Sequence, residues 1–168
     1  MEVKFDYGKS VKRVFELIAG FQCDISLHCN ERGIEISCIN VSKTCFVKAF
    51  LRGDEYTCKR DLCLPLNLND VSRVLRDVQN ESLKMVYKDG ANAIRFILKD
   101  GHCTRKVDVP LIQLEEENYN LELDRQDKIE MSSKQFKRIC SNFLKIGELM
   151  EIGVSDCLFF RVSEISNA

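Results

Sequence analysis

The chain has 168 residues, of which 45% are apolar and 30% are charged, and its formal net charge is −1. This length can bury one sizeable core or a domain and a half, and the near-neutral balance excludes a protein that is basic over its whole surface. No apolar run is long enough to span a membrane. The first ten residues, MEVKFDYGKS, lack the apolar stretch of a signal peptide, so secretion is not expected.

Nine cysteines are present, an odd number, and none of them forms a CxxC motif. Several lie in apolar runs, such as Cys38 in IEISCI and Cys140 in FKRICSNF. Free cysteine packs as a small apolar side chain in reducing compartments. We therefore expect buried thiols rather than disulfides. Neither His28 nor His102 has a cysteine at zinc-finger spacing, so no metal and no cofactor are expected.

The first 109 residues repeat one pattern twice. Alternation predicts a strand over residues 2–6, a helix follows over residues 8–19, and three strand-like runs come next, QCDISLHC, GIEISCI and TCFVKAFL. The pattern restarts with DLCLPLNL, in which Pro65 is unfavourable for a central strand. A helix capped by Asn69 or Asp70 then runs to about Val78, before the strand-like runs LKMVYK, AIRFILK and CTRKVDV. Each half therefore has a strand, a helix and three strands.

The character of the sequence changes over residues 110–126, which are acidic and lack a Gly-rich turn, and an extended connector is expected there. A third copy of the pattern follows, with KIEM in the strand position, a helix from Ser132 to about Lys145 that Ser132 or Ser133 can cap, and the strand-like runs ELMEIGV and CLFFRVS. We expect a first domain over residues 1–109 and the first half of a second domain over residues 127–168. Paired βαβββ units predict an α+β fold whose antiparallel sheets bury one face under the helices.

The three predicted helices share one apolar stripe and one basic stripe. Apolar residues recur at i, i+3, i+4 and i+7, as at Val11, Val14, Phe15 and Ile18. Segments 8–19, 69–78 and 132–145 contain nine Lys or Arg against three Asp or Glu, a net +6; since the whole chain is −1, the remaining residues carry −7. The candidate DNA-facing residues on the basic stripes are Lys9, Lys12, Arg13, Arg73, Arg76, Lys134, Lys137 and Arg138.

Two interpretations of the basic stripes stay open. Surface helices commonly carry lysines, and charged stripes are usually only solvated. Three helices with the same phase and sign instead favour a surface that binds phosphates and releases counterions without reading sequence. No aromatic residue lies on the stripes to stack on bases, so duplex rather than single-stranded DNA is the expected ligand.

The sequence gives no support for catalysis. The motifs GxxxxGK[ST], GxGxxG, HExxH and GxSxG do not occur. The two histidines are far apart in sequence, and the acidic run Glu115-Glu116-Glu117 is better explained as a solvated part of the connector than as a metal site. We therefore do not expect an enzyme.

Several stretches resemble the eukaryotic sliding clamp family, proliferating cell nuclear antigen. They are GIEISCINVSKTCFV, YTCKRDLCLPLNLNDVSRVLRDVQNESLKMVYKD, KVDVPL and MSSKQFKRICSNF. The resemblance implies a DNA-clamp fold in which three subunits form a ring, with helices on the inner face and antiparallel sheets outside. It implies a nuclear homotrimer that encircles duplex DNA as a processivity factor for DNA polymerase. A clamp loader and other replication and repair proteins are the further partners that it implies.

In this family, partners dock a short peptide motif into an apolar pocket beside the connector. The resemblance places Ile39, Val41 and Lys43 on the first-domain wall of that pocket. It places Tyr119, Leu121 and Leu123 on the connector side. The apolar connector residues could equally serve only to hold the connector against the sheet.

Two departures from the family affect these expectations. Family members continue beyond position 168, so the fourth repeat unit is expected to be missing, and the chain alone is not expected to form a stable closed trimer. The modifiable lysine of the family's second domain falls on Ser155. Three alternatives follow: a sliding clamp, a subunit of the checkpoint clamp, and an adaptor that keeps the partner pocket without closing a ring.

Overall fold

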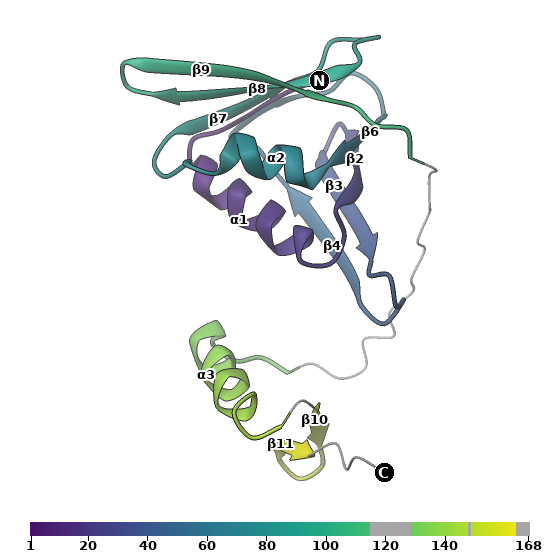
Figure 1. Cartoon of the computed structure of the whole chain (residues 1–168), viewed down its shortest axis with the longest axis vertical. Helices are drawn as coiled ribbons and strands as arrows, with labels where there is room; N and C mark the ends of the chain where they lie inside the picture. The colour runs from purple at the N-terminus through teal and green to yellow at the C-terminus, as the bar shows by residue number, and fades with distance from the viewer. Residues whose placement is uncertain (115–128, 148, 164–168) are drawn as a thin grey trace. The chain divides into compact units, whose positions relative to one another are not determined.

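A computed structural model of the chain describes residues 1–114, 129–147 and 149–163. The structure divides into two compact units, Met1–Asn120 and Leu121–Ala168, and each is described by itself. Unit 1 contains the helices α1 and α2 with strands β1 to β9, and unit 2 contains α3 with strands β10 and β11 (Figure 1). No helix in these ranges is both long enough and apolar enough to cross a membrane.

Unit 1 is built from two antiparallel sheets. Its elements are β1 (Glu2–Phe5), α1 (Gly8–Ala19), β2 (Asp24–Asn30), β3 (Gly33–Ile39), β4 (Phe46–Leu51), β5 (Glu55–Thr57), β6 (Leu62–Asn67), α2 (Leu68–Leu75), β7 (Ser82–Val86), β8 (Ala93–Asp100) and β9 (Cys103–Pro110). One sheet has the order β5-β1-β7-β8-β9 and the other β4-β3-β2-β6. The predicted α+β class is confirmed, and each half has the expected strand, helix and three strands. The short β5 is a further strand that the sequence pattern does not predict.

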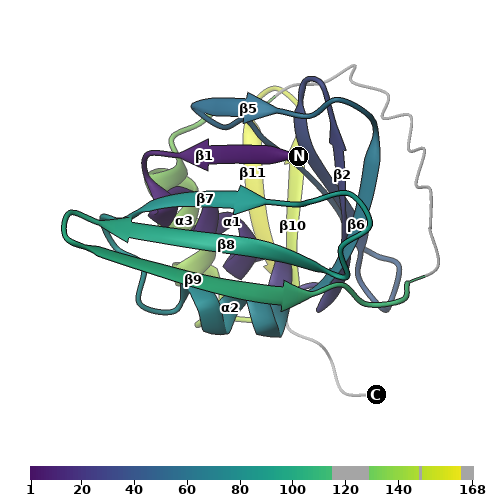
Figure 2. The ribbon, with the colours of Figure 1, turned by 90° about the horizontal axis from the view of Figure 1, so that it is seen from above.

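The two halves of unit 1 exchange their first strands. β1 opens the first half but pairs with β7 of the second half, with Val3 opposite Met85. β6 opens the second half but pairs with β2 of the first half, with Leu66 opposite Ile25. Figure 2 shows β1 between β5 and β7 in the five-stranded sheet. Each sheet therefore contains strands of both halves, and every element of the first half except β5 has a counterpart in the second.

The helices α1 and α2 pack side by side against both sheets: α1 contacts β4 of the four-stranded sheet, and α2 contacts β6 of that sheet and β9 of the five-stranded sheet (Figures 1 and 2). On α1 the apolar stripe Val11, Phe15 and Ile18 is at most 2% exposed. On α2 the corresponding residues Val71 and Leu75 are at most 1% exposed. The predicted apolar stripes therefore form the core of unit 1 together with the inward residues of the strands.

The N-terminal cap of α2 differs from the prediction. The cap is Asn67, whose side-chain Oδ1 accepts the backbone N–H of Asn69 at 2.9 Å. Asn67 is extended, with φ −90° and ψ 121°, as a capping residue requires. The helix ends at Leu75, short of the predicted Val78. The predicted cap at Asn69 or Asp70 is wrong because the helix already begins at the residue after Asn67.

Each helix begins with a backbone hydrogen bond to the opposite half. Gly8 donates its N–H to the carbonyl of Glu81 at 3.0 Å, just before β7. Leu68 donates its N–H to the carbonyl of Cys23 at 2.6 Å, just before β2. A Cβ atom at Gly8 would lie 2.8 Å from the Glu81 carbonyl oxygen, closer than real Cβ contacts allow. Gly8 is therefore required by the close approach of the two halves.

We expect Gly8→Ala to lower the free energy of unfolding of unit 1 by about 1–3 kcal/mol, because the added methyl group overpacks this contact. Urea unfolding followed by circular dichroism measures the change. Gly20→Ala is the matched control, since Gly20 has a helical φ of −69° and is exposed. Equal effects of the two substitutions would contradict a steric role for Gly8.

Unit 2 contains α3 (Ser133–Phe143), β10 (Leu149–Val154) and β11 (Leu158–Ser163). The two strands form an antiparallel hairpin. The predicted cap Ser132 is confirmed, since its Oγ accepts the N–H of Gln135 at 3.2 Å. The helix ends at Phe143 rather than Lys145. The predicted strand KIEM is wrong for residues 129–131, which are not in a strand, and Lys128 lies outside the described residues.

The cysteines fit the expectation of buried thiols only in part. All nine are described as thiols; Cys29, Cys38 and Cys58 are buried, whereas Cys23, Cys103 and Cys157 are exposed and the other three are intermediate. Burial raises the pKa of the Cys29 thiol to about 12. Within the described ranges, no three His, Cys, Asp or Glu residues are grouped so that they could hold a metal ion.

A thiol reagent should therefore distinguish two classes of cysteine in the native protein. Reagents attack the thiolate, and burial with a raised pKa keeps Cys29 protonated. We expect the exposed Cys23, Cys103 and Cys157 to react first at mildly alkaline pH, and Cys29 to react only after denaturation. Mass spectrometry of peptides after timed alkylation measures the order, and rapid labelling of Cys29 would contradict it.

Candidate nucleic-acid interface

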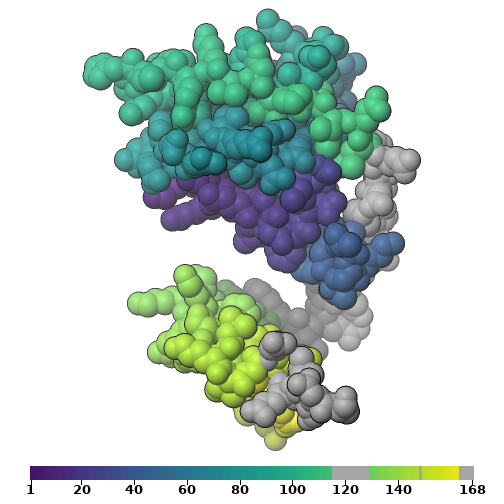
Figure 3. Space-filling model, viewed as in Figure 1, coloured from purple at the N-terminus to yellow at the C-terminus, as the bar shows by residue number. Residues whose placement is uncertain are grey.

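The α1 and α2 helices of unit 1 expose their basic stripes on adjacent surfaces. Because the apolar stripes of both helices face the sheets, Lys9, Arg13, Arg73 and Arg76 are exposed. In Figure 3 the surfaces of the first helix, in purple, and of the second, in teal, adjoin on the face shown. The structure thus brings together the predicted DNA-facing residues of the first two helices.

The arginines on this surface differ in their partners. Arg73 forms an ion pair with Asp70 on the same helix, with 3.1 Å between Nη1 and Oδ1. Among the described residues, no carboxylate lies within ion-pair distance of Arg13 or Arg76. Among the described residues, Arg13 and Arg76 therefore have no carboxylate that neutralises their charge, in contrast to Arg73.

The lysines of α1 connect it to the end of α2. Lys12 donates from Nζ to the backbone carbonyl of Arg76, and its side chain is only 15% exposed. Lys9 donates to Oε1 of Gln79 at 3.1 Å. A cation at the C-terminus of a helix also interacts favourably with the helix dipole. Lys12 thus braces the two helices, and its Nζ also lies 3.8 Å from Oε1 of Glu16 on the same helix.

Apolar side chains that no sequence pattern singled out lie beside the basic stripe of α1. Leu17 is 59% exposed one turn after Arg13, and Tyr7, the residue that precedes α1, is 75% exposed. Phe21 is 36% exposed just beyond the helix. Arg13, Leu17 and Phe21 are spaced at i, i+4 and i+8. This spacing in the sequence is the signal that places the two apolar residues on the same side as Arg13.

The third basic stripe lies on α3. Lys134, Lys137 and Arg138 are all exposed. They lie opposite the helix side formed by Ile139 and Phe143, and Phe143 packs edge to face on Phe160 with ring centroids 6.4 Å apart. α3 therefore has the predicted apolar side and basic side.

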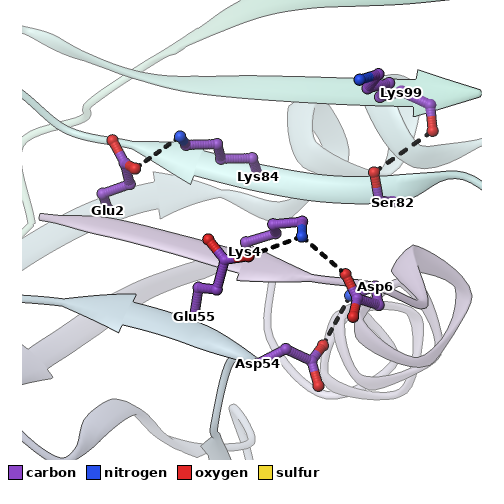
Figure 4. A network of polar contacts seen from close by, with 8 residues as sticks. All are labelled: Glu2, Lys4, Asp6, Asp54, Glu55, Ser82, Lys84 and Lys99. Carbon is purple, nitrogen blue, oxygen red and sulfur yellow. Dashed lines mark hydrogen bonds and ion pairs between the residues drawn. The ribbon is translucent and has the colours of Figure 1, made fainter.

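The outer strands present charges that are already paired. Figure 4 shows Lys4 bound to Glu55 at 2.9 Å and to Asp6 at 3.1 Å, with Lys84 bound to Glu2 at 2.6 Å. The hydrogen bond and charge of Glu55, with those of Asp6, raise the pKa of Lys4. These cations are matched by neighbouring acids, in contrast to Arg13 and Arg76 on the helices.

A second cross-strand pair extends this pattern to β8 and β9. Arg95 and Asp108 are opposite one another and form two hydrogen bonds, of 2.6 and 2.7 Å. The hydrogen bond from Arg95 holds the pKa of the Asp108 carboxyl below its usual range. The near-neutral total charge of the chain therefore combines strands whose charged residues are paired with helices that carry arginines without a carboxylate partner.

The predicted partner pocket is described on one side only. Ile39 is half-buried at the end of β3, and Val41 is 90% exposed in the loop that follows. Lys43 has a positive φ of 56°. The side chain of Asn40 holds this loop, since its Oδ1 accepts the N–H groups of Thr44 and Cys45, each at 2.9 Å. Tyr119, Leu121 and Leu123 lie outside the described residues.

The start of the predicted connector follows the edge of the four-stranded sheet. Leu111 donates its N–H to the carbonyl of Asn92 at 2.8 Å, and Ile112 donates to the carbonyl of Pro65 in β6 at 3.1 Å. Pro65 lies in an edge strand of this sheet, as its ring favours. The chain that leaves β9 therefore lies along the outer edge of β6. In the other sheet β5 lies along the corresponding edge of β1.

Comparisons with known proteins agree with this geometry. Residues 1–124 match the family model described as "Proliferating cell nuclear antigen, N-terminal domain". Proliferating cell nuclear antigen of Chaetomium thermophilum is 25% identical over 159 residues, covering 90% of this chain and 61% of the relative. A chain of the PCNA2-PCNA3 complex from Sulfolobus tokodaii has a TM-score of 0.81 at 21% identity, covering 99% of this chain and 70% of that chain.

Two βαβββ halves with exchanged strands and adjacent helices define the DNA-clamp fold, and the structural match agrees with it. The chain belongs to the proliferating cell nuclear antigen family, because the family model matches well over half of its residues. The chain spans about three fifths of the length of the Chaetomium relative.

We expect Lys12 and Arg13, neighbours on α1, to respond differently to the same substitution. Lys12→Gln should lower the free energy of unfolding by about 1–2 kcal/mol, because the hydrogen bond to α2 is lost. Arg13→Gln should change stability by less than about 0.5 kcal/mol, because the side chain is exposed. Urea unfolding of both variants measures these effects, and the reverse order would contradict the assignment.

Proposed function

We propose that the chain is part of a sliding clamp that encircles duplex DNA and serves as a processivity factor for DNA polymerase. The observation that carries this proposal is the pair of exposed arginines, Arg13 and Arg76, on adjacent helices of a clamp fold. Such cations neutralise phosphates and release counterions without reading bases. A protein held by the backbone alone remains able to slide along the duplex.

The proposed contact surface extends to all the predicted DNA-facing residues. Lys9 and Arg73 flank the two unpaired arginines, and Lys12 adds charge from its braced position. Lys134, Lys137 and Arg138 supply the same kind of surface on α3. The homotrimeric ring, the clamp loader and the nuclear location are proposed from membership of the family.

The proposed partner surface begins at the loop after β3. Val41 is almost fully exposed and the side chain of Asn40 fixes the loop around it. We assign Ile39, Val41 and Lys43, with Tyr119, Leu121 and Leu123, to the docking of short motifs from polymerases and other replication and repair proteins. The chain acts in this role as a scaffold rather than as an enzyme.

One observation favours the second candidate, an adaptor that does not close a ring. No residue of α3 is buried, so unit 2 is not packed like unit 1 in the part that the structure describes. An adaptor would keep the partner surface of unit 1 without DNA encirclement. Binding to DNA distinguishes the two functions.

The decisive experiment compares two double variants with equal charge changes. Arg13→Glu with Arg76→Glu should weaken binding to a labelled duplex and reduce the slope of log K against log salt by about one per lost phosphate contact. Arg52→Glu with Lys59→Glu is the control, since both residues are exposed outside the helices. Fluorescence anisotropy over a salt series measures both slopes.

Equal weakening by both double variants would show that net charge, not the helix surface, controls binding, and would contradict the proposal. No binding by the unmodified chain would favour the adaptor. Binding that depends on base sequence would also contradict it, because the proposed contacts reach only the backbone.

A further inference from the structure

A cavity of about 380 Å³ lies where β2 ends and β6 begins, and the proposed function makes no use of it. Cys63 of β6 and His28 of β2 both line this cavity. The two residues are directly opposite one another in the register of the two strands. Side chains in this position on antiparallel strands have Cβ atoms about 4.5–5.5 Å apart. The cavity therefore brings together a thiol, which is a nucleophile, and an imidazole, which is a base.

His28 and Cys63 lie on the face of the four-stranded sheet that is turned away from the core. Successive side chains of a strand point to opposite faces. Leu27 and Cys29, the neighbours of His28 in β2, are at most 1% exposed, whereas His28 and Cys63 are half-buried. A small reagent can therefore reach Cys63. Cys29 belongs to the core face, so it is not placed to form a disulfide with Cys63.

Charged groups from the neighbouring elements surround this pair. Asp61, which precedes β6, lines the same cavity, and Glu35 of β3 is directly opposite His28 on its other side. Lys48 of β4 lies 2.7 Å from Glu35, between Nζ and Oε1, and offsets part of its charge. An imidazolium at His28 is thus attracted by two carboxylates, whereas the Asp61 carboxylate repels a thiolate at Cys63. The row Cys63, His28 and Glu35 places a nucleophile, a base and an acid on three adjacent strands.

We propose that Cys63 is a modification site at which the chain exchanges with small disulfides of the glutathione type. The thiol proton passes to His28, and the resulting thiolate attacks one sulfur of the disulfide. A sulfur–sulfur bond to Cys63 forms as the bond of the small disulfide breaks, and the thiolate that leaves takes the proton from His28. The thiol and the disulfide only exchange partners, so no further oxidant is needed.

The site is separate from the proposed DNA surface. The helices α1 and α2 pack on the core side of the sheets, where their apolar stripes join the core. Cys63 lies on the other face, away from Arg13 and Arg76. Exchange at Cys63 therefore leaves the proposed DNA contacts in place, and a loss of DNA binding would not bear on this site.

The test is the rate at which each cysteine of the native 168-residue chain gains a glutathionyl group from glutathione disulfide, measured by mass spectrometry of peptides after timed incubation. An ordinary thiol is only about 1% thiolate at pH 6.5. A thiol whose proton is taken by a neighbouring base reacts there at least about tenfold faster, which we expect for Cys63 relative to the exposed Cys103. At about pH 9 ordinary thiols are mostly ionised and are the better nucleophiles, so Cys103 should overtake Cys63.

Two histidine substitutions separate the effect of the base from that of exposure. His28→Gln should lower the rate at Cys63 at about pH 6.5 by at least about tenfold, because the proton acceptor is lost. His102→Gln is the matched control: it removes the same group, but beside Cys103 in the sequence, and should leave the rate at Cys63 unchanged. Cys63→Ser should abolish the fast exchange. Circular dichroism reports whether each variant is folded, and if His28→Gln is not, the pH dependence of the unmodified chain decides.

Three results would overturn the proposal. One is a Cys63 that exchanges no faster than Cys103 at about pH 6.5. Another is a rate at Cys63 that is the same in folded His28→Gln and His102→Gln, since exposure alone would then control the exchange. The third is a parallel rise of the Cys63 and Cys103 rates between the two pH values, because the imidazole would then have no part in removing the proton.

Discussion

The exchange of β1 and β6 between the two halves determines the arrangement of the rest of unit 1. α1 follows β1 and α2 follows β6, so pairing each strand with the opposite half brings both helices to the same side of the sheets. The hydrogen bonds from Gly8 to Glu81 and from Leu68 to Cys23 fix where each helix starts against the opposite half. The adjacent basic surfaces of α1 and α2 are therefore a consequence of strand pairing, and the hydrogen bond from Lys12 to Arg76 then braces the two helices.

The division of charge follows from the different geometries of sheet and helix. Antiparallel strands place side chains directly opposite one another, and Arg95 and Asp108 use this register to neutralise each other. A helix with its apolar stripe buried groups its remaining residues on one side, where Arg13 and Arg76 have no acid opposite them. A chain with a net charge of −1 can thus keep a localised cationic surface without being basic overall.

The sequence predicted the elements well where periodicity was strong and poorly where a single contact decided the outcome. The repeated apolar stripes gave the helices and the order of strands, because burial sets that spacing. The three-residue β5 is too short to show alternation, and the cap of α2 depends on the orientation of the Asn67 side chain. The engagement of Lys12 with α2 depends on a carbonyl 64 residues away, which no local pattern contains.

The half that contains α3 has the same apolar and basic stripes as the two halves of unit 1. A physical reason is therefore needed for why it does not take the position of one of them in unit 1. The close approach at Gly8 gives a physical answer. A Cβ atom there would meet the Glu81 oxygen at 2.8 Å and Val78 at 3.1 Å. The corresponding first residue of α3 is Ser133, whose Cβ would meet the same oxygen in the place of Gly8, at a cost like that expected for Gly8→Ala. The contact at Gly8 therefore disfavours the third half in the place of the first, so a single glycine contributes to both the stability and the specificity of the pairing.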